Sequence, residues 1–283
     1  MSLLLVPLSF AAEPVVVGGG GAPDVGGLRD ETVLSWGDVQ LRPAAPESPA
    51  IGPDRVALGP DGAAAVYDPL AHRVLVVGGG SFSVAGLDGM AFATSGVLLV
   101  MDDTSRRLTA WDPSGALLDQ VSFPGLVPPG GTLELQGDVA VSRDVFGNGH
   151  PLAVVGTSGA LTAPTGPALL PAARMVEKVG SRIRVDGVTI AEISGEKGGA
   201  RVLGDWVIVE SLSAGAVTRT AIALDGGTRV TLPVRGRLYA PTDDISVSPE
   251  GELGWIDPRA DGLHLVDRKS TRLNSSHTVI SYA

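Results

Sequence analysis

Residues 56–77 have the sequence VALGPDGAAAVYDPLAHRVLVV, and two other stretches of the chain align with it without gaps. These are MAFATSGVLLVMDDTSRRLTAW at 90–111 and ISVSPEGELGWIDPRADGLHLV at 245–266. Each stretch consists of an apolar run, a turn with glycine, a second apolar run that ends in aspartate, a short loop and a third apolar run. Short apolar runs separated by Gly, Pro, Asp and Ser are typical of β-strands joined by turns. The stretches therefore predict a strand–turn–strand–loop–strand unit that recurs along the chain.

The positions that the copies share have structural explanations. The shared glycine can supply the positive φ that the first turn needs. The shared aspartate and arginine flank the loop, so their side chains can join across it by a charge-assisted hydrogen bond. In the third copy Gly262 replaces the arginine. The predicted structural repeat residues are Gly62, Asp68, Arg73, Gly96, Asp102, Arg107, Gly251 and Asp257.

The spacing of the repeat indicates how the units assemble. Asp68 and Asp102 are 34 residues apart, and the interval between Asp102 and Asp257 has room for two or three more divergent copies. A strand-rich unit of this size buries too little apolar surface alone, whereas units arranged in a ring cover one another. We therefore predict an all-β protein, a β-propeller of about five to six blades, over residues 31–266. Further predicted elements are a strand pair at 33–41 that supplies an outer or closing strand, a strand–loop–strand at 139–156, a helical stretch at 166–179, a hairpin around Asp186-Gly187 and another blade within 200–234.

Two copies of the unit carry a family resemblance. The pattern G-x3-V-x-D-x4-R-[VL], present at 62–74 and 96–108, resembles NHL-repeat β-propellers, and residues 245–256 are similar to the Ser-Pro-Asp-Gly turn of TolB-type propeller repeats. The resemblance covers about a third of the chain and implies a propeller fold. It implies no single function, because NHL-type rings serve as binding platforms, as scaffolds and occasionally as lyases.

Residues 144–152 resemble the calcium loop of FG-GAP propeller blades. Such a loop needs oxygen ligands at its first, third, fifth and ninth positions, since Ca²⁺ takes six to eight oxygens. Asp144 and Asn148 fit the first and fifth positions, but Phe146 and Leu152 occupy the third and ninth. A tight structural turn is therefore the preferred interpretation, with calcium as the one cofactor candidate. No catalytic and no cofactor-binding residue is predicted.

Other motifs have structural interpretations. The glycine-rich stretches at 15–23 and 76–86 are not followed by a helix, so they are predicted to be linkers or turns and not phosphate-binding loops. The histidines lack the HExxH spacing, and no GxSxG motif is present. The tryptophans, at positions 36, 111, 206 and 255, are expected to pack between blades and not to form a sugar-binding platform.

The two ends of the chain differ from the predicted ring. Residues 1–12 contain a short apolar run that ends in small residues, as a secretory signal peptide does, and residues 13–30 are predicted to be a flexible leader. Residues 267–283 resemble a translated sequencing-library adapter, so we exclude them from the propeller. The propeller is therefore expected to be incomplete at its C-terminus. An open seam near 33–42 and 245–266 would follow from such a truncation.

Composition restricts the function further. The formal net charge of −10 disfavours nucleic acid and anionic membranes as partners, because both are bound chiefly through Lys and Arg. The absence of cysteine excludes disulfides, thiolate catalysis and cysteine-based metal sites. No apolar run is long enough to be predicted as a transmembrane segment.

Together these observations predict a non-catalytic, exported propeller. We expect a bacterial protein, periplasmic or extracellular, that acts as a monomeric platform for a protein or an extracellular polymer. Two alternatives stay open. One is a propeller enzyme of the lyase or lactonase type with a metal at the central channel, which requires several carboxylate, Asn or His side chains at one mouth of the channel. The other is a structural module of a larger secreted protein.

Overall fold

The computed structural model describes residues 29–45, 48–123, 131–144, 148–164, 174–193, 198–213, 216–233, 238–239 and 243–268 of the 283-residue chain. Regular structure in these residues consists of β-strands and one 3-10 turn, η1, at Pro60–Gly62. The strands form six antiparallel sheets, of which five have four strands and one has three. The predicted all-β class is confirmed.

The sheets follow one another along the chain, and we number them as blades 1 to 6. Blade 1 consists of β2 (Arg55–Leu58), β3 (Ala64–Asp68), β4 (Arg73–Val76) and β5 (Ser81–Ser83). Blade 2 consists of β6 (Gly89–Phe92), β7 (Leu98–Asp102), β8 (Arg107–Trp111) and β9 (Leu117–Ser122). Blade 3 consists of β10 (Thr132–Gln136), β11 (Val139–Arg143), β12 (Gly149–Val155) and β13 (Leu161–Thr162). Blades 4 and 5 consist of β14 (Val176–Val179), β15 (Arg182–Val185) and β16 (Val188–Glu192); and β17 (Ala200–Leu203), β18 (Trp206–Ser213), β19 (Ala216–Ala223) and β20 (Arg229–Leu232). Blade 6 consists of β21 (Ile245–Val247), β22 (Leu253–Arg259), β23 (Gly262–Arg268) and, outermost, β1 (Arg29–Leu34).

The second strand of a blade is apolar on both faces because it packs against two neighbouring blades. In β7, Leu98 and Val100 pack against blade 1, whereas Leu99 and Met101 pack against blade 3. Alternate side chains of a strand point to opposite faces, so each face of the sheet contributes to a different core. This arrangement explains why the middle of the repeat is a continuous apolar run and not an alternating one.

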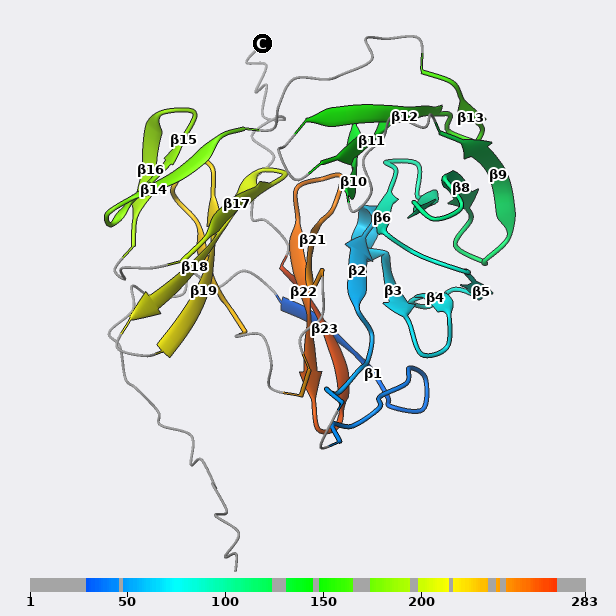
Figure 1. Cartoon of the computed structure of the whole chain (residues 1–283), viewed down its shortest axis with the longest axis horizontal. Coiled ribbons are helices and arrows are strands. Elements are labelled where there is room, and N and C mark those ends of the chain that lie inside the picture. The colour runs from blue at the N-terminus through cyan, green and yellow to red at the C-terminus, as the bar shows by residue number, and fades with distance from the viewer. Residues whose placement is uncertain are drawn as a thin grey trace, which may run out of the picture.

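The hydrophobic core is divided among the interfaces between blades. The described residues form five buried clusters, which lie between blades 1 and 2, 2 and 3, 4 and 5, 5 and 6, and 6 and 1. Figure 1 shows the first strands of blades 6, 1 and 2 (β21, β2 and β6) side by side toward the middle of the molecule. Blades 4, 5, 6, 1, 2 and 3 therefore pack face to face in this order, with the last blade of the chain against the first, as in a β-propeller, which confirms the predicted fold. None of the five clusters of described residues joins blades 3 and 4.

The seam between the chain ends is closed, and the prediction of an open seam was wrong. Strand β1 pairs with β23 through six residue pairs, from Arg29↔Arg268 to Leu34↔Leu263. The N-terminal strand therefore supplies the fourth strand of blade 6, which confirms that this region contributes a closing strand. It does so as one strand and not as the expected pair, because the chain turns after Leu34. The pairing also begins before residue 31 and extends past residue 266, since a strand ladder requires extended backbone and not particular side chains.

Other predicted elements have mixed outcomes. The hairpin around Asp186 and Gly187 is confirmed: the two residues have φ of +50° and +82° and connect β15 to β16. The blade within 200–234 is blade 5. The prediction of a helix at 166–179 was wrong for the residues that the structure describes, because Val176–Val179 form β14 and pair with Arg182–Val185. The rest of that stretch, the signal-like segment 1–12 and most of the adapter-like segment lie outside the described residues.

Candidate binding site at one mouth of the ring

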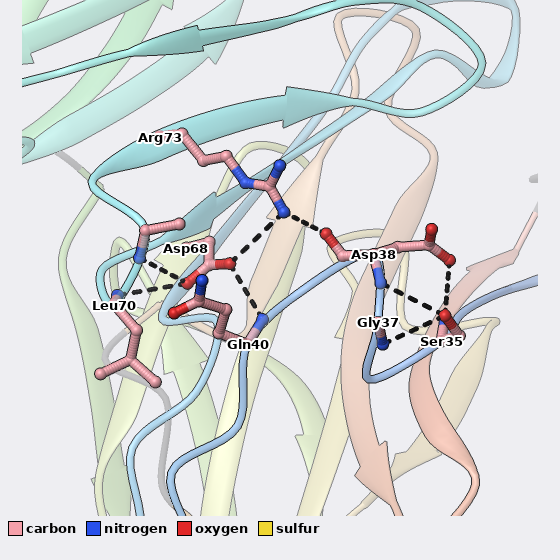
Figure 2. Close-up of polar contacts among 8 residues, drawn as sticks. Ser35, Gly37, Asp38, Gln40, Asp68, Leu70 and Arg73 are labelled. Carbon is pink, nitrogen blue, oxygen red and sulfur yellow. Dashed lines mark hydrogen bonds and ion pairs between the residues drawn. The ribbon is translucent and has the colours of Figure 1, made fainter.

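The aspartate that ends the second strand of blade 1 holds three segments together. Asp68 is fully buried, and its Oδ1 accepts hydrogen bonds from the N–H groups of Leu70 and Ala71, both at 3.2 Å. Its Oδ2 accepts one from Gln40 at 2.9 Å and lies 3.8 Å from Nη2 of Arg73, across the loop as expected. Arg73 also donates to a carbonyl of the segment that follows β1 (Figure 2). Asp68 therefore joins its own loop to the N-terminal segment.

The equivalent aspartates of the other copies differ from Asp68 in their contact with arginine. Asp102 accepts hydrogen bonds from the N–H groups of Thr104 and Ser105 at 2.9 and 3.0 Å, but Arg107 is exposed and forms no ion pair with it in the described structure. Asp257 forms its ion pair with Arg259, at 2.8 Å. The turn glycines do share one conformation: Gly62, Gly96 and Gly251 have φ of +78°, +82° and +86°.

Asp144, the first residue of the calcium-like loop, stands directly after β11. This is the place that Asp68 and Asp102 hold at the ends of β3 and β7. Its carboxylate accepts hydrogen bonds from the backbone and side-chain nitrogens of Asn148, at 2.9 and 3.0 Å, and lies 3.1 Å from Nε2 of His150. These contacts are those of an aspartate that stabilises a turn. Within the described ranges, no group of three or more His, Asp or Glu side chains is arranged to hold a metal ion.

The sequence alignment missed a second repeated aspartate. Asp54, Asp88 and Asp243 each lie 14 residues before the aspartate that ends the second strand, at 68, 102 and 257. Each stands one or two residues before the first strand of its blade, so all three lie at the mouth of the ring where those strands begin. Extending the alignment upstream by two residues would have found them.

Two arginines connect these aspartates across four blades. Nη1 of Arg55 lies 2.8 Å from Oδ2 of Asp243 in blade 6 and donates to the carbonyl oxygen of Asp88 in blade 2, at 2.6 Å. Nε of the same arginine lies 3.7 Å from Oδ2 of Asp54. From blade 5, Nη1 of Arg201 lies 3.6 Å from Oδ1 of Asp243. We call these five residues the mouth cluster.

The mouth cluster is fixed but open to solvent. The side chains of Arg55, Asp243, Asp54 and Arg201 are 16%, 25%, 27% and 40% exposed, and Asp88 is partly buried. The carboxylate of Asp88 accepts a hydrogen bond from the N–H of Asp103 at 2.7 Å, which holds it in place. Beside it, the N–H of Asp243 donates a backbone hydrogen bond to the carbonyl of Asp54, and the carbonyl of Asp243 accepts one from Val56, both at 3.1 Å. The cluster therefore presents charges of both signs in positions set by the blades themselves.

Two tyrosines lie in the field of these acids. Burial, with the negative charge of Asp54 as the next cause, raises the pKa of both Tyr67 and Tyr239. The Tyr239 ring packs on Gly52, where a Cβ atom would lie 2.7 Å from two ring carbons. Both phenols therefore stay protonated and neutral beneath the charged surface.

A buried ion pair fixes blade 5 to blade 6 next to the cluster. Arg219, which is 1% exposed, donates from Nη2 to Oδ1 of Asp244 at 3.0 Å and from Nη1 to the carbonyl of Pro233 at 3.1 Å. Oε1 of Glu210 lies 3.2 Å from its Nε. Because Asp244 follows Asp243, this pair sets the position of the mouth cluster on the side of blade 5.

The remaining aromatic and imidazole residues are spread over the fold. Trp206 and Trp255 are buried between blades 5 and 6, and Trp111 stacks on Phe82 with ring centroids 3.9 Å apart. Trp36 donates to a backbone carbonyl of β22. The histidines lie apart: His72 in a loop of blade 1, His150 beside Asp144 and His264 at the seam.

Comparisons with known proteins identify no family. No protein-family model and no curated protein matches the sequence. Among solved structures, the chain is similar to that of U3-55K, with 12% identity over 81% of this chain and 83% of that chain and a TM-score of 0.37. It is also similar to BamB from Moraxella catarrhalis, with 15% identity over 85% of this chain and 98% of that chain and a TM-score of 0.33. At these values neither match indicates a function. In the part of the chain that the structure describes, no helix is long and apolar enough to cross a membrane.

Proposed function

We propose that this protein is a non-catalytic, exported platform that binds another protein at the mouth cluster. The observation that carries the proposal is the chain of contacts Arg201–Asp243–Arg55–Asp88, which spans four blades and stays partly open to solvent. Binding surfaces gain affinity when their polar groups are already held in the bound geometry, because less conformational entropy is lost on association.

The charges of the mouth cluster favour a partner with charges of both signs. Arg201 is the most exposed member and is held by one ion pair of 3.6 Å, so its guanidinium can take a carboxylate from a partner. Asp54 and Asp243, which are 27% and 25% exposed, can take a basic group beside it. A polypeptide can carry an acidic and a basic side chain within a few residues, whereas a neutral polysaccharide carries no charged groups. We therefore favour a protein partner over a polymer.

A peptide-display selection tests this proposal even while the natural partner is unidentified. Peptides selected on the purified chain are expected to carry acidic residues and to lose at least tenfold in affinity on Arg201→Glu. The matched control is Arg182→Glu, because Arg182 is 65% exposed and lies in blade 4, outside the mouth cluster. Selected peptides that bind both variants equally would contradict the proposal, as would selective retention of a polysaccharide in the same assay.

The alternative of a propeller enzyme with a metal has one observation in its favour. Asp54, Asp88 and Asp243 recur at equivalent places around the mouth, as the enzyme hypothesis requires. Each carboxylate, however, already has an arginine or a backbone N–H close by. Calorimetry of the dialysed protein with Ca²⁺, Mg²⁺, Mn²⁺ and Zn²⁺ separates the two functions. Micromolar binding that is lost in Asp88→Asn would favour the enzyme; in the platform, none of these ions binds at the mouth.

A structural module of a larger protein is the third candidate, and it is favoured if neither peptides nor metals bind.

A further inference from the structure

The central hairpin of blade 5 extends farther at the mouth of the ring than those of blades 1 and 2. In blades 1 and 2 the first strand begins opposite Tyr67 and Met101, and the second strand ends one residue later. In blade 5 the first strand begins opposite Val209, and β18 continues for four more residues to Ser213, paired with β19. At 3.3 Å per residue, this extension rises about 13 Å above the start of β17. We call residues 210–213 and 216–219 the blade 5 ribbon; β18 and β19 lie side by side at the left of Figure 1.

One face of the blade 5 ribbon is directed to blade 6. Alternate residues of a strand share a face, and Ile208 of β18 packs in the core between blades 5 and 6. Arg219 of β19 forms its ion pair with Asp244 on the same side. The residues that continue these two rows toward the end of the hairpin are Leu212 and Val217, which are directly paired. Both side chains therefore point to the side of blade 6, and we call them the apolar pair.

The apolar pair is exposed. Leu212 is 41% exposed and Val217 is 45% exposed, and neither belongs to a buried cluster of the described residues. Scattered exposed apolar residues are ordinary on protein surfaces, whereas an apolar pair beside a charged site can lose its contact with water when a ligand covers both. The apolar pair is therefore a place where a partner can bury an apolar side chain.

Arg201 of the mouth cluster lies on the same face, at the foot of the ribbon. It is paired with Ile208, and Leu212 is four residues farther along β18, so the two positions are about 13 Å apart in the direction of the strand. Between them lies Arg219, whose Nε is 3.2 Å from Oε1 of Glu210. An extended polypeptide also advances about 3.3 Å per residue. A carboxylate at Arg201 and an apolar side chain at the apolar pair are therefore about four residues apart in the partner.

The charged residues at the same end of blade 6 are paired with one another. Oε1 of Glu31 lies 2.6 Å from Nδ1 of His264 and 2.8 Å from Nη1 of Arg259, and Oδ1 of Asp261 lies 3.0 Å from Nε2 of His264. Hydrogen bonding with His264 is the largest cause that lowers the pKa of Glu31 and of Asp261. Arg259 is held at 2.8 Å, whereas Arg201 lies 3.6 Å from its ion-pair partner. Arg201 is therefore the cation that a carboxylate of a partner can reach beside the ribbon.

We propose that the blade 5 ribbon is one wall of the partner site, and that the bound segment of the partner carries a large apolar residue about four positions from an acidic one. The acidic residue meets Arg201, and the apolar residue covers the apolar pair. The residues between them pass over Glu210 and are not acidic, because like charges repel. This inference rests on the proposed function, since it names the chemistry of the partner that the mouth cluster takes.

Peptides selected by display on the purified full chain test the inference. They are expected to share an acidic residue and a Leu, Ile, Met or Phe residue about four positions apart. The double variant Leu212→Thr, Val217→Thr keeps side chains that suit a strand and removes much of the apolar surface, so it should weaken binding of the tightest peptide about tenfold. Val179→Thr with Val188→Thr is the matched control and should leave binding unchanged, because both valines are exposed, at 55% and 66%, and belong to blade 4.

The outcomes separate this inference from the proposed function. Peptides that lose affinity on Arg201→Glu but bind the Leu212→Thr, Val217→Thr variant as tightly as the wild-type chain would overturn the inference and leave the proposed function in place. Peptides that bind Arg201→Glu without loss would contradict the proposed function and the inference with it.

A substitution in the peptide keeps the test valid if the double variant does not fold. Replacing the apolar residue of the tightest peptide by alanine should weaken its binding to the wild-type chain about tenfold. An alanine peptide that binds as tightly as the selected one would overturn the inference.

Discussion

Replacing Asp68 by alanine should destabilise the ring far more than the same change at Asp102, although the two residues are equivalent in the repeat. Asp68 is fully buried and accepts three backbone hydrogen bonds, one of them from Gln40 in the N-terminal segment. The alanine leaves these donors without an acceptor and Arg73 without its carboxylate. A buried group left unpaired costs about 1–3 kcal/mol. We expect a total loss of about 3–5 kcal/mol, less than the sum of separate losses because the contacts share one acceptor.

Asp102 supplies the matched comparison. It caps a loop in the same way, but its partners Thr104 and Ser105 are exposed, and water can replace the carboxylate. Asp102→Ala should therefore cost about 1–2 kcal/mol. Asp68→Asn should fall between the two alanine variants, because an amide oxygen can serve one side of the site while the amide N–H₂ opposes the donor from Gln40.

Urea denaturation followed by tryptophan fluorescence measures these differences. The midpoint and slope give the free energy of unfolding, and unchanged slopes show that the variants unfold over the same surface. Equal losses at the two aspartates would refute the reasoning, because burial would then have no influence on the strength of the loop contact. A loss at Asp68→Asn as large as at Asp68→Ala would refute the claim that an amide oxygen can still accept hydrogen bonds on one side of this site.

Three further predictions follow from packing and charge. The lowered pKa values of Glu31 and Asp261 mean that their contribution to stability is present above the unfolded-state values of 4.5 and 3.8 and is lost as pH falls through the lowered folded-state values. Glu31→Gln should therefore flatten the acid limb of the stability profile measured by thermal unfolding. Gly80→Ala should lower the free energy of unfolding, measured by urea denaturation, by about 2 kcal/mol or more, because the added Cβ would overlap the backbone oxygen of Ser114 in the next blade. Gly199→Ala is the control, since a Cβ at Gly199 has nothing within 4 Å and the loss should be less than about 1 kcal/mol. Leu99→Ala, fully buried between blades 2 and 3, should cost about 3–4 kcal/mol by the same measurement, and a loss below about 1 kcal/mol would contradict the assigned core.

The blades could be predicted from the sequence because the residues that determine each blade are close together in the chain. The apolar run from Ala63 to Tyr67 and the turn at Gly62 lie within one unit, and the unit recurs, so one observation applied to several places. The hairpin at Asp186-Gly187 was likewise set by two adjacent residues. Where local signals conflicted, as at Val176–Val179, strand pairing with β15 overrode the apparent helical pattern.

The seam and the mouth could not be predicted in the same way. Glu31 and His264 are 233 residues apart, and nothing in either neighbourhood indicates that they meet. The contact between Arg55 and Asp243 spans 188 residues and depends on the order of the blades in the ring. The repeated aspartates of the mouth cluster could have been found in the sequence, because Asp54, Asp88 and Asp243 each precede the aspartate that ends the second strand by 14 residues. The arginines that join the blades do not recur, so alignment could not assign them.

The position of β1 in blade 6 has a consequence for biosynthesis. Among the described strands β1 is translated first, whereas its partner β23 is translated last. Until β23 is translated, β1 is therefore an unpaired strand that can pair with strands of other chains. Pairing of β1 with β23 must bring together residues that are separated by more than 200 others. Loop closure over such a separation is slow compared with hairpin formation. We therefore expect that a chaperone which covers β1 until β23 has been translated increases the yield of native protein, measured by refolding with and without it, more than one that acts on an internal blade.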